Sequence, residues 1–310
     1  MTPPDIATTL RKVSALRSLC LRLPHVPTPA EKRLLERFEA LTAAPTRATA
    51  ADMEAIAVGW SGWWRGGNTG KVLDMAARIP VDLIEASQTA SSIWAGALRA
   101  RWESIQHLVW LCAACVGRNL VETKLRQQTP PLQVRPKLLV VSIAPPFEVT
   151  ALKKQARSAT NDPDDKLRRF LERVLGLAWT ELTARGLALV HAVKCGIVPE
   201  DGHQNPPNGV VDECAPRHLM CELLLARPLV AVTLGRAAYR AVVQALRAAG
   251  CSNSDGQLRL TRPPAAAHQS GYVVSLPDQQ FRLFVGPFIR ASLGPDAAAL
   301  IRAAASAAGL

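Results

Sequence analysis

The sequence predicts an α/β fold: a three-layer α/β/α sandwich around a mainly parallel sheet, with a helical N-terminal domain. Two observations carry this prediction. Apolar runs rich in Leu and Val at residues 137–141, 187–195 and 229–234 have the composition of strands buried on both faces. Stretches with helical spacing alternate with these runs, and that alternation is typical of strand–helix–strand units.

The chain has 310 residues, of which 48% are hydrophobic, and this is enough for one large or two modest cores. We predict a helical domain over residues 1–105 and an α/β domain over residues 106–310. Lys and Arg number 37 against 25 Asp and Glu, a net charge of +12, and most of the excess follows residue 105. A positive surface suits a polyanion such as nucleic acid, although a solvated basic surface is the alternative.

Several classes of protein are disfavoured. No apolar run approaches the ~20 residues needed to span a bilayer, and the N-terminus lacks a secretory pattern. The seven cysteines are an odd number at scattered positions, which argues against a secreted disulfide framework. We expect a cytoplasmic monomer that does not associate with a membrane.

The N-terminal hundred residues are expected to be helical. Residues 6–42 have amphipathic spacing, and residues 71–110 are largely helical in pattern, with a break at Pro80. A glycine-rich loop with three tryptophans, residues 59–70, separates them. Its aromatic rings would either stack on nucleic-acid bases or anchor the loop to its own core, and we favour the core.

The remaining elements follow in order. Prolines and glycines bound each one, because Pro cannot continue a helix or a ladder and Gly marks turns. The expected strands lie at residues 137–141, 187–195, 229–234, 271–276 and 281–285, and the expected helices at residues 166–177, 211–226, 236–249 and from Asp296 onward.

One stretch carries a specific pattern. An apolar run ends in Ala192-Val193-Lys194-Cys195, a loop rich in Pro, Gly and Asn leads to Cys214, and a helix ends at Arg227-Pro228 before a strand that ends at Leu234-Gly235. This order, spacing and composition resemble the iron–sulfur (family 4) uracil-DNA glycosylases and the related family 5 enzymes. In outline the resemblance covers residues 106 to 310.

The resemblance implies a [4Fe–4S] cluster. Its ligands would be Cys112, Cys115, Cys195 and Cys214, and its role would be structural. By itself the Cys112–Cys115 pair is ambiguous, since zinc and redox sites also use Cys-x-x-Cys, and zinc remains the alternative metal.

The resemblance also locates a base pocket after the first strand. The family motif Gly-Glu-Ala-Pro-Gly corresponds to residues 142–146, so Ser142, Ile143, Ala144 and Pro145 are expected to line the pocket. Ile143 replaces the family's carboxylate.

If the chain is an enzyme, another carboxylate must then stabilise the positive charge that develops on the sugar. Asp162 and Asp164 are the candidates, with Asp165 and Glu148 as further acids. The alternative for the aspartates is a turn that caps the next helix.

Two further family positions differ. His191 aligns with the Asn that recognises the base, and it would contact the base or act as an acid, unless it is only a satisfied core histidine. Thr160 falls near the Phe that stacks on uracil. Smaller or changed side chains at these positions would open the pocket to a larger base.

The family's His-Pro-Ser loop corresponds to residues 286–292. Pro287, Phe288, Arg290 and Ser292 are expected to contact DNA, with Phe288 as a wedge and Arg290 on phosphate. The tripeptide His268-Gln269-Ser270 imitates the motif but precedes the predicted hairpin, so it is a weaker candidate.

These features predict a DNA glycosylase that flips a non-standard base out of double- or single-stranded DNA and hydrolyses its N-glycosidic bond. The expected base is a modified pyrimidine, for example a hypermodified cytosine of phage DNA, excised in antiviral defence. Uracil excision in base excision repair is one alternative. A non-catalytic iron–sulfur DNA-binding protein and a zinc-stabilised scaffold are two others.

Overall fold

The structure is a computed structural model. It describes residues 121–126, 136–145, 166–197, 206–251, 262–276, 279–287 and 294–310, together with isolated positions between residues 29 and 115. The chain divides into two compact units, residues 1–101 and 102–310. In the first unit every described position is helical, in line with the expected helical content. The second unit contains the sheet.

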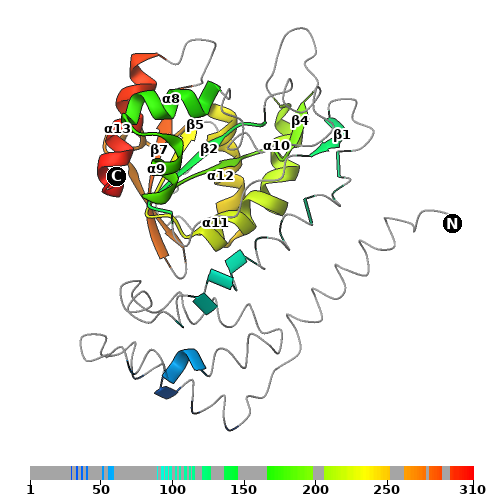
Figure 1. Ribbon diagram of the computed structural model, residues 1–310. Helices are drawn as coiled ribbons and strands as arrows, with labels where there is room; N and C mark the ends of the chain where they lie inside the picture. The colour runs from blue at the N-terminus through cyan, green and yellow to red at the C-terminus, as the bar shows by residue number, and fades with distance from the viewer. Residues whose placement is uncertain are drawn as a thin grey trace, which may run out of the picture. The chain divides into compact units, whose positions relative to one another are not determined.

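A five-stranded sheet forms the centre of the second unit (Figure 1). Its strand order is β3-β2-β5-β7-β6, with all neighbours parallel except β6, which pairs antiparallel with β7 at one edge. The sequence prediction of a mainly parallel sheet is confirmed. The strands are β2 (Leu138–Ser142), β3 (Leu187–His191), β5 (Val230–Leu234), β6 (Tyr272–Leu276) and β7 (Gln279–Gly286).

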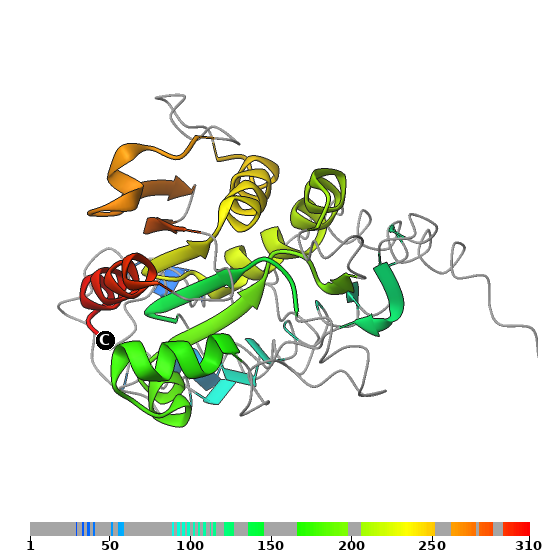
Figure 2. The same cartoon turned by 90° about the horizontal axis from the view of Figure 1, so that it is seen from above.

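Helices cover both faces of this sheet, which completes three layers (Figures 1 and 2). We call one side the α8 face; it is covered by α8 (Lys166–Leu175), α9 (Trp179–Ala184) and α13 (Pro295–Ala308). We call the other side the cysteine face; it is covered by α10 (Asn208–Cys214), a π-helical turn (Ala215–Leu219), α11 (Met220–Ala226) and α12 (Arg236–Ala248).

Strand alternation divides the apolar side chains between the two faces. Val140 and Leu189 are buried in the core under α8, whereas Val141 and Val190 are buried in the core under the cysteine face. Because every residue of β2 and β3 is buried, these strands read in the sequence as continuous apolar runs rather than as alternating ones.

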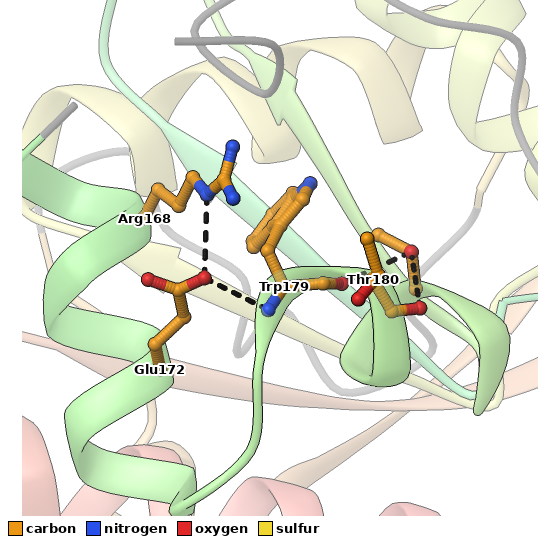
Figure 3. A network of polar contacts seen from close by, with 5 residues as sticks. Arg168, Glu172, Trp179 and Thr180 are labelled. Atoms are coloured by element: carbon orange, nitrogen blue, oxygen red, sulfur yellow. Dashed lines mark hydrogen bonds and ion pairs between the residues drawn. The ribbon is translucent and has the colours of Figure 1, made fainter. Parts of the chain in front are cut away.

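The start of α9 depends on a side chain from α8 (Figure 3). Ala178 precedes α9 and has no side chain that caps it. Glu172 Oε1 instead accepts a hydrogen bond from the backbone N–H of Trp179 at 2.8 Å and one from Arg168 Nε at 3.3 Å. The Arg168 guanidinium also lies 5.8 Å from the centroid of the Trp179 ring. This network fixes the angle between the two helices.

The predicted helix at residues 211–226 is longer and less regular than expected. It begins at Asn208, and residues 215–219 form a π-helical turn between α10 and α11. Pro216 supplies a physical reason, because it has no N–H with which to continue the α-helical ladder. The run ends at Arg227, whose φ of 48° is left-handed and which precedes Pro228.

The strand predicted to run to Cys195 ends at His191 instead. Cys195 begins a short strand, β4 (Cys195–Ile197), which pairs antiparallel with β1 (Val121–Arg126) in a separate two-stranded sheet. Strand β1 was not predicted from the sequence. The signal was present, since Val121, Thr123 and Leu125 alternate with charged residues.

No helix among the described residues combines the length and apolar character needed to cross a membrane.

Candidate functional site

A buried pair of polar side chains lies where two parallel strands end. Ser142 closes β2 and His191 closes β3, and the parallel register sets the two residues opposite each other. Ser142 Oγ and His191 Nδ1 share a hydrogen bond, and the side chains are only 8% and 3% exposed. In open α/β sheets this carboxyl edge is where ligands bind.

The imidazole of His191 is neutral at physiological pH. Burial and, to a smaller extent, the positive charge of Lys194 together lower the pKa of His191 to about 3. A neutral imidazole has one donor and one acceptor nitrogen. Nδ1 is engaged by Ser142, and Nε2 has no hydrogen-bond partner among the described residues. Nε2 is therefore the atom that can meet a ligand.

The loops after β2 and β3 continue side by side beyond the strands. The Ala192 N–H donates to Ser142 O, and the Val193 N–H donates to Ile143 O, both at 2.8 Å. Ile143 and Ala144 are half-buried, and Pro145 is buried. All the predicted pocket residues that the structure describes therefore lie together at this edge.

No acidic side chain faces this edge among the residues that the structure describes directly after β2, β3, β5 and β7. The predicted acids Asp162 and Asp164, the further acids Asp165 and Glu148, and the predicted pocket residue Thr160 lie outside the described residues. By strand alternation, Ser142 and His191 point to the α8 face, and Asp164 precedes the first residue of α8 by two positions.

The predicted DNA-contacting segment is described only at its start. Pro287 follows β7 directly and is exposed, whereas Phe288, Arg290 and Ser292 lie outside the described residues. His268 ends a 3₁₀ turn (Ala265–His268), and its Nδ1 bonds Val285 O at 2.8 Å. Although it precedes the hairpin in sequence, the exposed imidazole therefore lies beside the carboxyl end of β7.

The four predicted cluster ligands line one pocket. Cys112 and Cys115 come from the segment before β1, Cys195 begins β4, and Cys214 ends α10. Val109, Val193, Val210, Lys194 and His218 lie in the same wall. Pairing of β1 with β4 brings the Cys195 strand beside the chain that follows Cys115.

The electrostatics of this pocket call for a cation. Burial raises the pKa of the Cys214 thiol to about 12, the backbone N–H of Lys194 opposes that shift, and Cys195 and Cys112 raise the pKa further. Several thiolates would therefore not coexist here without positive charge. No disulfide joins the six cysteines that the structure describes.

A single-ion site is not formed by this arrangement. Within the described part of the chain, no three His, Cys, Asp or Glu side chains converge closely enough to hold one metal ion. Four thiols that line one pocket match in number the donor set of a [4Fe–4S] cluster, and four cysteines also serve structural zinc sites.

Sequence reasoning missed the ion pair of Lys194 and Glu222. Lys194 Nζ donates to Glu222 Oε2 and to the backbone oxygen of His191, and the two side chains are 2% and 0% exposed. Burial raises the pKa of the Glu222 carboxyl, and Lys194 opposes that shift. The only signal was a lone acid in the apolar run of α11, and nothing in the sequence pairs it with Lys194.

Comparison with known proteins identifies one family. The sequence model of the uracil DNA glycosylase superfamily matches residues 130–286, which span β2 to β7 and include Ser142, His191, Cys195 and Cys214. No curated protein matches the chain.

Proposed function

Because the chain belongs to the uracil DNA glycosylase superfamily, whose members are DNA glycosylases, we propose that it hydrolyses the N-glycosidic bond of a flipped-out, modified pyrimidine in DNA. Flipping is required because the bond is not accessible inside a stacked duplex. The net charge of +12 supports binding to the DNA backbone.

The observation that carries this proposal is the Ser142–His191 pair at the carboxyl edge. Donation by the Ser142 hydroxyl to Nδ1 satisfies the only side-chain donor of Ser142 and leaves the imidazole proton on Nε2. The Nε2–H group then donates to a carbonyl oxygen of the base. This bond strengthens as the departing base gains negative charge, so it favours the transition state over the ground state.

The sugar needs a separate partner as it acquires oxocarbenium character. We assign this role to Asp162 or Asp164, which precede α8 in the sequence; α8 itself covers the face to which Ser142 and His191 point. The carboxylate would stabilise the sugar cation and orient the attacking water.

The substrate assignment rests on the changed positions. Ile143, His191 and Thr160 stand where the resembling enzymes have a carboxylate, an Asn and a stacking Phe. A smaller side chain than Phe leaves room for a bulky substituent on the pyrimidine ring, as in hypermodified cytosines of phage DNA. Such an activity would act in antiviral defence rather than in repair.

We also propose that Cys112, Cys115, Cys195 and Cys214 hold a [4Fe–4S] cluster, supported by the shared pocket and its four-thiol donor set. When bound, the cluster would supply the positive charge that four thiolates require and a cross-link between three segments of the chain.

The decisive assay offers duplex and single-stranded oligonucleotides that carry uracil, hypoxanthine or modified cytosines, and it measures abasic product. We expect release of a modified cytosine. Asp162→Asn, Asp164→Asn or His191→Ala should lower release at least ~100-fold while DNA binding is retained. Tight, salt-sensitive binding without any abasic product would instead identify a non-catalytic DNA-binding protein, and release of uracil alone would indicate a repair enzyme.

Metal analysis of anaerobically purified protein tests the cluster. We expect about four irons per chain and loss of the brown colour in Cys195→Ser. Cys221→Ser is the matched control, because Cys221 lies on α11 and does not line the cysteine pocket. A colourless protein with one zinc would refute the cluster.

A further inference from the structure

The turn between β3 and β4 connects the two parts of the candidate site. It begins at His191, whose imidazole bonds Ser142, and ends at Cys195 in the wall of the cysteine pocket. Only three residues separate them, so any movement of this turn shifts the base-contacting imidazole and the thiol together.

Lys194 closes this turn on both sides. Its Nζ donates to the backbone oxygen of His191, three residues earlier, and Lys194 itself lines the cysteine pocket beside Cys195 and Cys214. The backbone of the turn is also joined to the end of β2 through the N–H groups of Ala192 and Val193. One residue therefore contacts both the strand end that carries the imidazole and the pocket wall.

Glu222 holds the ammonium of Lys194 from the other side. It lies on α11, beyond the π-helical turn that follows Cys214, and its Oε2 accepts from Nζ. Its second oxygen, Oε1, has no hydrogen-bond partner among the described residues. The pair is fully buried, so neither side chain can exchange its partner for bulk water.

Stability alone does not account for such a pair. Removing two charges from water costs as much as their attraction returns, and a hydrophobic pair of similar volume is commonly as stable or more stable. A buried pair that is also hydrogen-bonded to a strand end does, however, fix the position of that strand end. The ammonium group can donate to the carboxylate and to the backbone oxygen together only in a few arrangements of these partners.

We propose that Lys194, held by Glu222, is a positioning residue that sets the imidazole of His191 relative to the cysteine pocket. The consequence for base release rests on the proposed glycosylase function, whereas the consequence for the turn does not. Lys194 touches neither base nor sugar in this assignment, and it acts through the backbone of His191.

The test removes both charges at once, so that no lone charge is left buried. Lys194→Met combined with Glu222→Leu is compared with Asp212→Leu combined with Arg240→Met. The control pair joins α10 to α12 through bonds of 2.7 and 2.5 Å and does not touch the turn. If the first double variant does not fold, Lys194→Gln with Glu222→Gln replaces it, since two amides can still bond each other.

Hydrogen exchange measured by mass spectrometry reports on the turn without any substrate. We expect the peptide over residues 191–197 to exchange at least about tenfold faster in the Lys194/Glu222 variant, because a charge-assisted hydrogen bond no longer closes the turn. The control pair should leave this peptide unchanged. Wild-type exchange in the Lys194/Glu222 variant would overturn the proposal.

Single-turnover base release and DNA affinity report on function. We expect release to slow roughly 100-fold, the cost of misplacing a catalytic group by about 1 Å, with an unchanged Kd for DNA. A purely structural pair would leave the rate of the folded double variant at the wild-type value, and that result would refute positioning. If the wild type releases no base, the proposed function fails, and hydrogen exchange alone decides the role of Lys194.

Discussion

The α8 face and the cysteine face of the same sheet differ in what they bury. Under α8, α9 and α13 an apolar cluster with large side chains such as Phe170, Leu171 and Trp179 fills the core, and Ser142 and His191 point to this face at its carboxyl edge. Under the cysteine face the described residues include Lys194, His218 and Glu222, all buried. Apolar burial stabilises without directing geometry, whereas buried charges direct geometry at a cost. The α8 face thus combines an apolar support with the Ser142–His191 pair at its edge, and the cysteine face holds the buried charges that bear on the position of that pair.

The largest effect should follow from splitting the buried pair. Glu222→Leu leaves the Lys194 ammonium buried without its partner, and we expect a loss of about 3–5 kcal/mol in the free energy of unfolding. Urea denaturation measures it. A loss of less than about 1 kcal/mol, the size typical of an exposed ion pair, would show that the cysteine face tolerates an isolated buried charge. The contrast between the two faces would then disappear.

Truncation on the α8 face should cost nearly as much but act differently. Leu171 is 0% exposed, so Leu171→Ala should lower the free energy of unfolding by about 2–5 kcal/mol through a cavity. Because the lost contacts are apolar and lie away from the cysteine pocket, iron content and base release by the folded variant should match the wild type. Loss of iron in this variant would mean that the two faces do not act separately.

Acid should weaken the protein through His191. Its pKa is about 3 in the folded protein and 6.5 as its ordinary value, so the unfolded chain binds the proton more readily between these limits. Above pH 6.5 the imidazole is neutral in both states and stability is not reduced. As the pH falls from 6.5 toward 3, the free energy of unfolding decreases, by roughly 3 kcal/mol at pH 4. The measurement is the difference in unfolding free energy between the wild type and His191→Asn from pH 7 to pH 4. Carboxylates such as Glu222 contribute to both proteins and cancel, and a flat difference would show that the imidazole is not buried as a neutral group.

The smallest effect belongs to an ion pair on the outer surface of the α8 face. Arg185 and Glu181 lie 2.5 Å apart, with side chains 52% and 46% exposed. Water screens such a pair, so Arg185→Ala should change stability by less than about 0.5 kcal/mol. If Arg185→Ala lowered the free energy of unfolding as much as Glu222→Leu, the exposure of the Arg185–Glu181 pair would not explain its smaller expected contribution.

Much of the fold was predictable because it follows from local patterns. Apolar runs bounded by Pro and Gly predicted the five strands of the main sheet, and helical spacing predicted α8, α12 and α13 within one or two residues at most ends. Residues 187–195 show where this fails. The apolar pattern continues to Cys195, but the strand ends at His191, because the Lys194 side chain bonds back to the His191 carbonyl.

The site was predictable only in part, because its contacts join distant positions. Ser142 and His191 were each expected at the pocket, but their mutual hydrogen bond depends on the register of β2 and β3. Glu222 lies 28 positions from Lys194, on α11 beyond the π-helical turn. Pro216 indicates a disturbance of the helix there, but nothing in the sequence shows which acid meets the lysine. The grouping of Cys112, Cys115, Cys195 and Cys214 as ligands came from the family resemblance; the cluster itself and the catalytic acid remain predictions.

The π-helical turn Ala215–Leu219 accommodates one more residue than a regular helix would. Each residue rotates an α-helix by about 100°. Because the π-helical turn absorbs this additional residue locally, deleting one residue from it would restore a regular helix and leave α11 in nearly its present phase. Deleting one residue from the regular part of α11 before Glu222 would instead rotate Glu222 by about that angle, away from Lys194. A deletion of the same size in a surface loop would rotate nothing. The π-helical turn therefore keeps α11 in phase with α10 despite the additional residue, and it preserves the side of α11 that meets the lysine.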